Sequence, residues 1–115
     1  MEKLCVFQVL ECNKVLYKVL EQRTTFPISV GLKIYKIMKE FDNVEEYVFD
    51  TMDMTFPNFV WDNMTNEQLE FYKTLISQEI EVDFEKIQQN VFENNDKLLL
   101  TVEDVGALSI ILSEK

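Results

Sequence analysis

The chain has 115 residues, of which 47% are hydrophobic and 12% aromatic, and it carries a net charge of −10. This length suits one domain with a single core, and the apolar share excludes a disordered acidic tail. Two glycines and two prolines are too few for the closely spaced turns of an all-β fold. The composition therefore predicts one domain, residues 1–115, rich in helices.

The charge is distributed unevenly along the chain. Residues 1–39 carry 7 Lys and Arg against 3 Glu, whereas residues 40–115 carry 18 Asp and Glu against 4 Lys. Such an acidic region attracts positively charged proteins and repels nucleic acid. We therefore expect a protein partner with a basic surface, no direct binding of nucleic acid or membrane, and a possible homodimer through opposite charges.

Neither an export signal nor a membrane span is evident. The longest apolar runs, at 107–108 and 110–112, are far shorter than the ~20 residues that cross a bilayer, and the first residues lack a secretory pattern. A cytoplasmic protein is expected. Cys5 and Cys12 have no metal-ligand spacing and are expected to be reduced core residues.

Two helices are predicted in the first half of the chain. Helical spacing of apolar residues predicts the first over 7–22, and residues 1–6 are compatible with a short strand that leads into it. A sustained apolar stripe predicts a second, long helix over 27–53, with Pro27 in its first turn and Thr25 as its cap.

An irregular connection and a short helix are predicted next. Residues 54–63 lack periodicity and contain several aromatic residues. Thr65 followed by Gln68 is the pattern of a capping box, in which each side chain bonds the backbone of the other. A short helix is therefore predicted from this box to Ile76.

The remainder is predicted to combine strands and one helix. Residues 79–85 alternate acidic and apolar residues, the pattern of a half-buried strand. A second strand is predicted at about 96–101, and Thr101 is expected to cap a last helix over about 102–112. The fold class is thus α+β: three to four helices, one of them long, packed on a small antiparallel β-hairpin of residues 79–85 and 96–101.

The outward face of the 79–85 strand is the most regular polar feature. Alternate side chains on a strand are ~6.5–7 Å apart, so its carboxylates form a ridge that could imitate a phosphate backbone. The alternative is a solvated face that keeps the protein soluble. With acids of the long helix, including Asp42 and Asp53, the predicted partner-binding carboxylates are Glu79, Glu81, Asp83, Glu85, Glu45, Glu46 and Asp50.

The segment 56–61, Phe-Pro-Asn-Phe-Val-Trp, is the best candidate for an apolar anchor. Aromatic residues in loops can be binding hot spots, although a lone Trp beside two Phe also commonly closes the core of a small domain. Phe59 or Trp61 is the member expected to be exposed, and both complete the predicted partner-binding surface.

No constellation indicates an enzyme. The chain has no His, the side chain most used for proton transfer near neutral pH, and no phosphate-binding glycine loop or nucleophile elbow. Carboxylate-only, metal-dependent hydrolysis is an alternative, but an acidic chain offers many unspecific acid pairs. We predict no enzymatic activity, no cofactor and no metal.

Four segments form a further pattern: Phe26-Pro27, Leu32–Ile37, Glu79–Asp83 and Leu100–Glu103. Their order, over about residues 15–112, resembles that of small tailed-bacteriophage proteins of uncharacterised function. The aromatic loop at 56–61 and the segment 93–100 depart from that pattern. The resemblance implies a phage origin and a non-enzymatic role, and it supplies no site residues.

These observations converge on a function by contact. We expect an acidic, non-enzymatic phage protein that binds and inhibits a host defence or nucleic-acid-handling protein, through nucleic-acid mimicry, in the host cytoplasm. The alternative is a phage structural or assembly protein that self-associates or binds a virion component.

Overall fold

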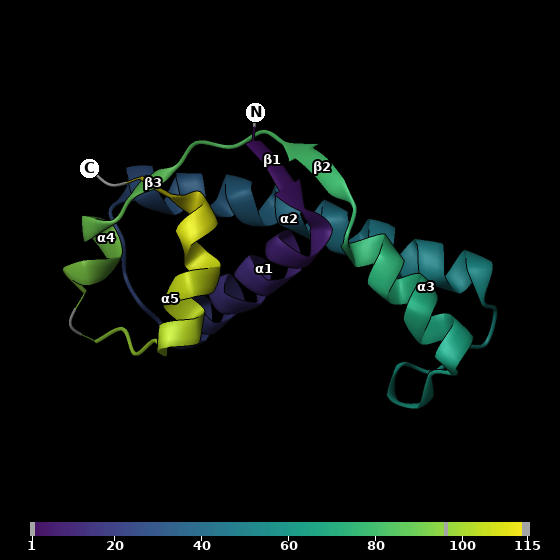
Figure 1. The fold of residues 1–115 in the computed structure, drawn as a ribbon. Helices are drawn as coiled ribbons and strands as arrows, with labels where there is room; N and C mark the ends of the chain where they lie inside the picture. The colour runs from purple at the N-terminus through teal and green to yellow at the C-terminus, as the bar shows by residue number, and fades with distance from the viewer. Residues whose placement is uncertain (1, 96, 114–115) are drawn as a thin grey trace.

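The computed structural model describes residues 2–95 and 97–113. Within them the α+β class is confirmed, and Figure 1 shows α1 running between the long α2 and the short α5. None of the described helices is long and apolar enough to cross a membrane. In chain order the elements are β1 (Glu2–Cys5), α1 (Val6–Glu21), α2 (Ile28–Thr55), η1 (Trp61–Asn63), α3 (Asn66–Ile76), β2 (Glu79–Val82), β3 (Ile87–Gln88), α4 (Asn90–Glu93), α5 (Val102–Leu108), η2 (Ser109–Ile111) and β4 (Leu112–Ser113).

The antiparallel two-stranded sheet is present, but its strands come from distant parts of the chain. β1 pairs with β2, with Glu2 opposite Val82 and Cys5 opposite Glu79, and the short β3 and β4 pair in parallel. The strand predicted before α1 is therefore confirmed, and it takes the place of the predicted hairpin partner.

The predicted partner strand at 96–101 was wrong. Residues 97–101 form no strand, and residue 96 lies outside the described residues. The side chain of Gln22 bonds both the N–H and the carbonyl of Leu99, each at 2.8 Å. Because a side chain already satisfies these backbone groups, this segment does not need a neighbouring strand.

The helix boundaries follow the sequence closely, with two corrections. The start of α2 is capped by Pro27 without a side-chain hydrogen bond, so Thr25 is not its cap. The last helix, α5, ends at Leu108 and continues as the 3₁₀ turn η2 rather than as α-helix to residue 112. The capping box predicted at Thr65 is present, and Thr101 caps α5 as predicted and also forms a capping box with Asp104.

Two hydrophobic cores share the long helix α2. The larger, which we call the body core, joins α1, the first half of α2, α5 and the short strands. Its side chains are mostly aliphatic and closely buried, and Phe41 packs edge-to-face on Phe84 with ring centroids 5.7 Å apart. The fully buried members include Leu16, Ile37, Phe41, Leu108 and Ile111.

The smaller core stabilises the arm, which we define as residues 44–76. The arm extends from one end of the molecule in Figure 1. Only Leu75 is buried on α3. Around it lie aromatic side chains that are only partly buried, such as Phe56 and Phe71, whose ring centroids are 5.3 Å apart. The arm is thus less completely buried than the body.

Candidate functional site

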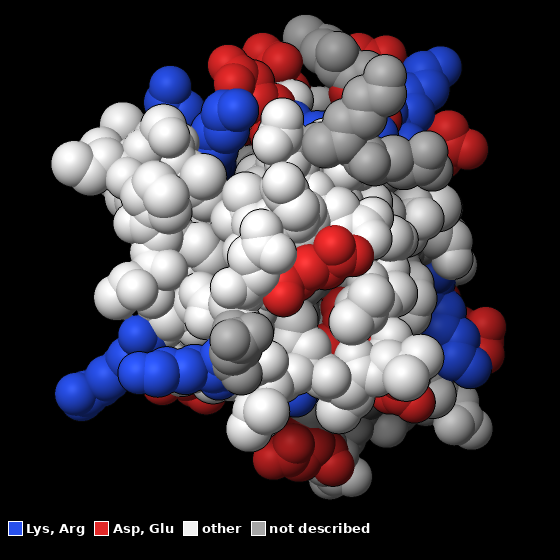
Figure 2. Space-filling view, turned by 90° about the vertical axis from the view of Figure 1, so that its left-hand side faces the viewer, with Lys and Arg blue, Asp and Glu red and all other residues white. Residues whose placement is uncertain are grey.

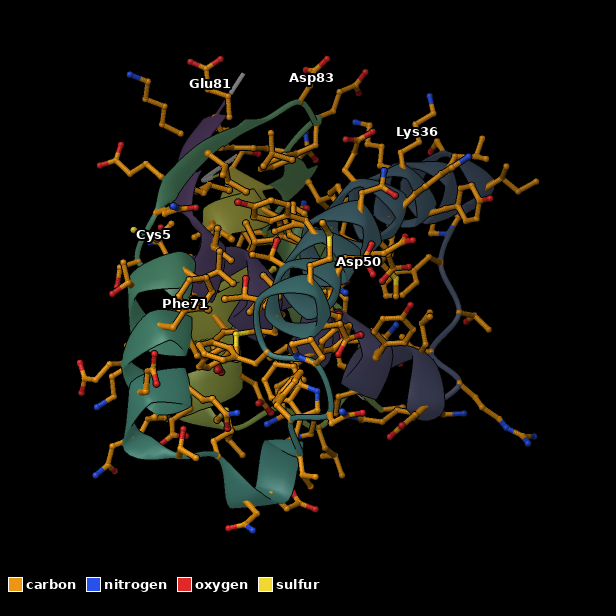
Figure 3. The ribbon with its side chains drawn as sticks, turned by 90° about the vertical axis from the view of Figure 1, so that its right-hand side faces the viewer. Cys5, Lys36, Asp50, Phe71, Glu81 and Asp83 are labelled. Carbon is orange, nitrogen blue, oxygen red and sulfur yellow. The ribbon has the colours of Figure 1, made fainter. Side chains whose placement is uncertain are left out.

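The four carboxylates predicted to form a ridge are exposed on one edge of the molecule. Ile80 and Phe84 are half-buried and Val82 is buried between them, so the predicted alternation of burial is present, but the strand itself ends at Val82 and not at residue 85. Glu81 and Asp83 project together from this edge in Figure 3. The exposed acidic side chains are Glu79, Glu81, Asp83 and Glu85.

Lysines stand beside this ridge. Lys3 lies opposite Glu81 in the β1–β2 register, and Lys33 Nζ is 3.7 Å from a carboxylate oxygen of Glu85. Asp83 and Glu85 also share the lining of a pocket of about 500 Å³ with lysines from the first half of α2. The ridge is therefore a surface of mixed charge, which is a weak imitation of a uniformly negative phosphate backbone.

The predicted acids of the long helix occupy different places. Glu46 and Asp50 are exposed, and Figure 3 shows Asp50 on α2, apart from Glu81 and Asp83. Glu45 is half-buried and faces a groove described below. The nine predicted residues thus do not form one contiguous surface.

The predicted aromatic anchor is part of a four-ring cluster, which we call the aromatic corner. Trp61 is 40% exposed and makes edge-to-face contacts with Phe59, Phe49 and Tyr72 at centroid distances of 4.8, 5.4 and 5.4 Å. Phe59 is half-buried. These rings join the loop to α2 and α3, so they contribute to the arm while leaving apolar surface accessible.

A groove of about 800 Å³ runs along α1 between α2, α3 and α5, and we call it the α1 groove. Apolar side chains, including Val15 and Val48, form part of its lining, and Phe49 and Tyr72 connect it to the aromatic corner. Five carboxylates and two lysines also line it: Glu11, Glu21, Glu45, Glu103 and Asp104, with Lys14 and Lys18. The groove therefore combines apolar surface with a surplus of negative charge.

A polar cluster lies where α1 meets α2 at this groove. Asn13 is fully buried, and its Nδ2 donates to Asp42 Oδ1 at 2.9 Å and to Glu45 Oε2 at 3.1 Å. The hydroxyl of Tyr17 donates to Asp42 at 2.9 Å. Asn13 Oδ1 is buried, and no described residue donates a hydrogen bond to it.

The pKa directions of two tyrosines reflect this negative environment. The hydrogen bond to Asp42 is the main cause that raises the pKa of Tyr17, followed by burial and the charges of Asp42 and Glu45. Burial is the main cause that raises the pKa of Tyr72, followed by the charges of Glu11 and Glu45. Both hydroxyls are therefore neutral donors near pH 7.

One ion pair holds α5 in place as a wall of the α1 groove. Lys18 of α1 bonds Asp104, the residue that also completes the capping box of α5 with Thr101. The bond from Lys18, and next the backbone N–H of Thr101, lowers the pKa of Asp104. Because Lys18 is already paired with Asp104, Lys14 is the one groove lysine left to face the other carboxylates.

Both cysteines are free, but Cys5 is half-buried and not a core residue as predicted. Cys12 is buried, and burial raises the pKa of its thiol to about 12. Among residues 2–95 and 97–113, no group of three or more His, Cys, Asp or Glu is placed to hold a metal ion. Comparison of the chain with protein-family models, with curated proteins and with solved structures returns no match.

Proposed function

We propose that this is a non-enzymatic binding protein whose α1 groove accepts a positively charged segment of another protein. The observation that carries the proposal is the lining of this groove, in which five carboxylates face two lysines beside apolar side chains. Charge complementarity favours the binding of a basic partner and disfavours the binding of acidic ones.

The two parts of the groove have different roles in this proposal. Its carboxylates would steer a basic segment and make association fast and sensitive to salt. The aromatic corner would supply the desolvated centre of the contact, because large aromatic side chains dominate binding energy at interfaces. A volume of about 800 Å³ accommodates a short segment rather than a whole domain.

Binding of a basic segment in the α1 groove would inhibit a nucleic-acid-handling protein. Proteins hold phosphate groups mainly with Lys and Arg side chains. A groove that binds such a segment competes with the nucleic acid for it, without imitating the phosphate spacing. The resemblance to small phage proteins leads us to place the partner among host defence or nucleic-acid-handling proteins of the host cytoplasm.

The fluorescence of Trp61 offers a direct test, because this is the one Trp of the chain and it contacts two groove side chains, Phe49 and Tyr72. Titration with a cationic amphipathic peptide is expected to change the emission saturably, and the affinity is expected to fall between about 50 and 200 mM salt, because salt screens the attraction between the charges.

Two variants with the same change of charge locate the contact. Glu11→Gln combined with Glu45→Gln should weaken the peptide's affinity, whereas Glu79→Gln combined with Glu81→Gln on the ridge should leave it within about twofold. Equal losses in both, or a larger loss on the ridge, would contradict the groove as the binding site.

A second candidate function, assembly with copies of itself or with a virion component, is favoured by an apolar stripe on α2. Ile28, Leu32 and Tyr35 lie on one helix face and are 82, 54 and 63% exposed. Figure 2 views the end of the molecule where α2 begins, and uncharged side chains cover most of this face. Solution mass at two salt concentrations separates the candidates: a large, salt-indifferent oligomer favours assembly, and a monomer or dimer favours the binding protein.

A further inference from the structure

The polar cluster of α1 and α2 has too many hydrogen-bond acceptors for its donors. Asp42 and Glu45 converge on a single amide nitrogen, so their nearest oxygens are no more than about 6 Å apart. Among the described residues, no lysine or arginine lies within ion-pair distance of either carboxylate. Two half-buried negative charges are thus held by neutral donors alone, an arrangement that favours a cation.

The buried carboxamide of Asn13 adds a third acceptor to the cluster. Its nitrogen must face the carboxylates, because the opposite orientation would set oxygen against oxygen. Oδ1 is therefore left without a donor among the described residues, although the side chain is fully buried. Buried acceptors are costly when unpaired, so the cluster as a whole has more acceptors than donors.

We infer that this cluster binds the guanidinium group of an arginine side chain of the partner. The inference rests on the proposed function and names the anchor of the basic segment. A guanidinium has five N–H donors and no acceptor, and its planar fork suits two nearby carboxylates. The apolar lining from Leu10, Val15 and Val48 suits the methylene stem that precedes it.

The approach to the cluster runs through the groove. Glu45 and Tyr17 line the groove. Glu45 accepts from the fully buried Asn13, and Tyr17 donates to the half-buried Asp42. Tyr17 is 45% exposed, so moving its ring aside does not open the core. An entering guanidinium contacts Glu45 and replaces the tyrosine hydroxyl as donor to Asp42.

The test uses the full chain and follows the side-chain amide signals of Asn13 by ¹⁵N NMR. The probe is N-acetyl-arginine methylamide, compared with the matching lysine and norleucine compounds. Saturable shifts of the Asn13 signals are expected with the arginine probe, weaker binding with lysine, and none with norleucine. Absence of shifts with arginine, or equal shifts with norleucine, overturns the inference.

Matched variants separate this site from general attraction to an acidic protein. Asp42→Asn combined with Glu45→Gln should weaken arginine binding at least ~10-fold, whereas Asp53→Asn combined with Glu67→Gln, outside the groove, should not change it. Tyr17→Phe leaves both carboxylates in place and removes the competing hydroxyl, so it should strengthen binding severalfold. This second variant tests the inference even where the first pair lowers stability.

The outcomes also distinguish the anchor from the proposed function. A cationic peptide that changes Trp61 emission but leaves the Asn13 signals unmoved overturns the anchor and keeps the groove. Absence of binding by any cationic peptide overturns the proposed function itself. Stronger shifts of the Asn13 signals with Mg²⁺ or Ca²⁺ than with the arginine probe would replace the guanidinium site by a metal site.

Discussion

The body and the arm of this molecule use their apolar residues differently, although α2 runs through both. The body encloses mainly aliphatic side chains almost completely. The arm buries three side chains among the described residues, Val48, Met52 and Leu75, and its aromatic rings remain partly accessible around them. This contrast indicates that the body supplies most of the stability, whereas in the proposed function the arm and the adjoining α1 groove present the surface for binding.

The largest expected effect of a single substitution is in the body. Phe41→Ala removes a fully buried ring and should lower the free energy of unfolding by about 3–5 kcal/mol. Phe71→Ala, at a half-buried position of the arm, should cost roughly half as much, because less apolar surface leaves water there. Urea denaturation measures both, and equal losses would remove the distinction between the regions.

Local opening should reveal the same contrast. Leu75 is the one buried side chain of α3, so Leu75→Ala should weaken the arm by about 2–4 kcal/mol. Hydrogen exchange is expected to accelerate throughout α3 and to change little in α1. If the amides of α1 lose the same protection, the arm and body unfold as one unit and the contrast fails.

The two capping boxes provide a matched pair of smaller perturbations. Thr65→Ala and Thr101→Ala each remove one capping hydroxyl, which costs about 1 kcal/mol. The loss at Thr101 should be the larger, because its partner Asp104 also holds Lys18 and so joins α5 to α1. Urea denaturation of the two variants tests this order, and a larger loss at Thr65 would reverse it.

The pH dependence of stability should show the smallest effect and should arise in the body. The pKa of Asp104 is lowered in the folded protein, so its contribution is present above the ordinary carboxyl value of about 4. That contribution is lost as the pH falls through the lower folded value. Asp104→Asn should flatten this part of the curve in acid denaturation, whereas Glu67→Gln in the arm serves as the control. An unchanged slope in Asp104→Asn would contradict the assignment.

The local features of the fold could be predicted from the sequence, because their signals lie within a few residues. The apolar stripe of α2, the alternation at 79–85, the capping box at Thr65 and the cap at Thr101 are of this kind. The pairing of β1 with β2 could not be predicted in the same way. Its partners lie far apart in the chain, and the bonds of Gln22 to Leu99 carry no local sequence signal.

The candidate site was less accessible to prediction for a related reason. Counting charges along the chain identified an acidic region, but it could not show that Lys3 and Lys33 fold beside the ridge. The α1 groove takes its lining from four helices. Of the nine predicted residues, Glu45 lines this groove and Trp61 contacts its aromatic end.

In the proposed function the negative groove along α1, and not the edge strand, receives a basic partner. Backbone and side-chain ¹⁵N shifts of the full chain, followed during titration with one cationic amphipathic peptide, locate the bound peptide. The shifted signals are expected to gather on α1, on α2 around Glu45 and on the indole of Trp61. Shifts centred on Glu79 and Glu81 would contradict the proposed function.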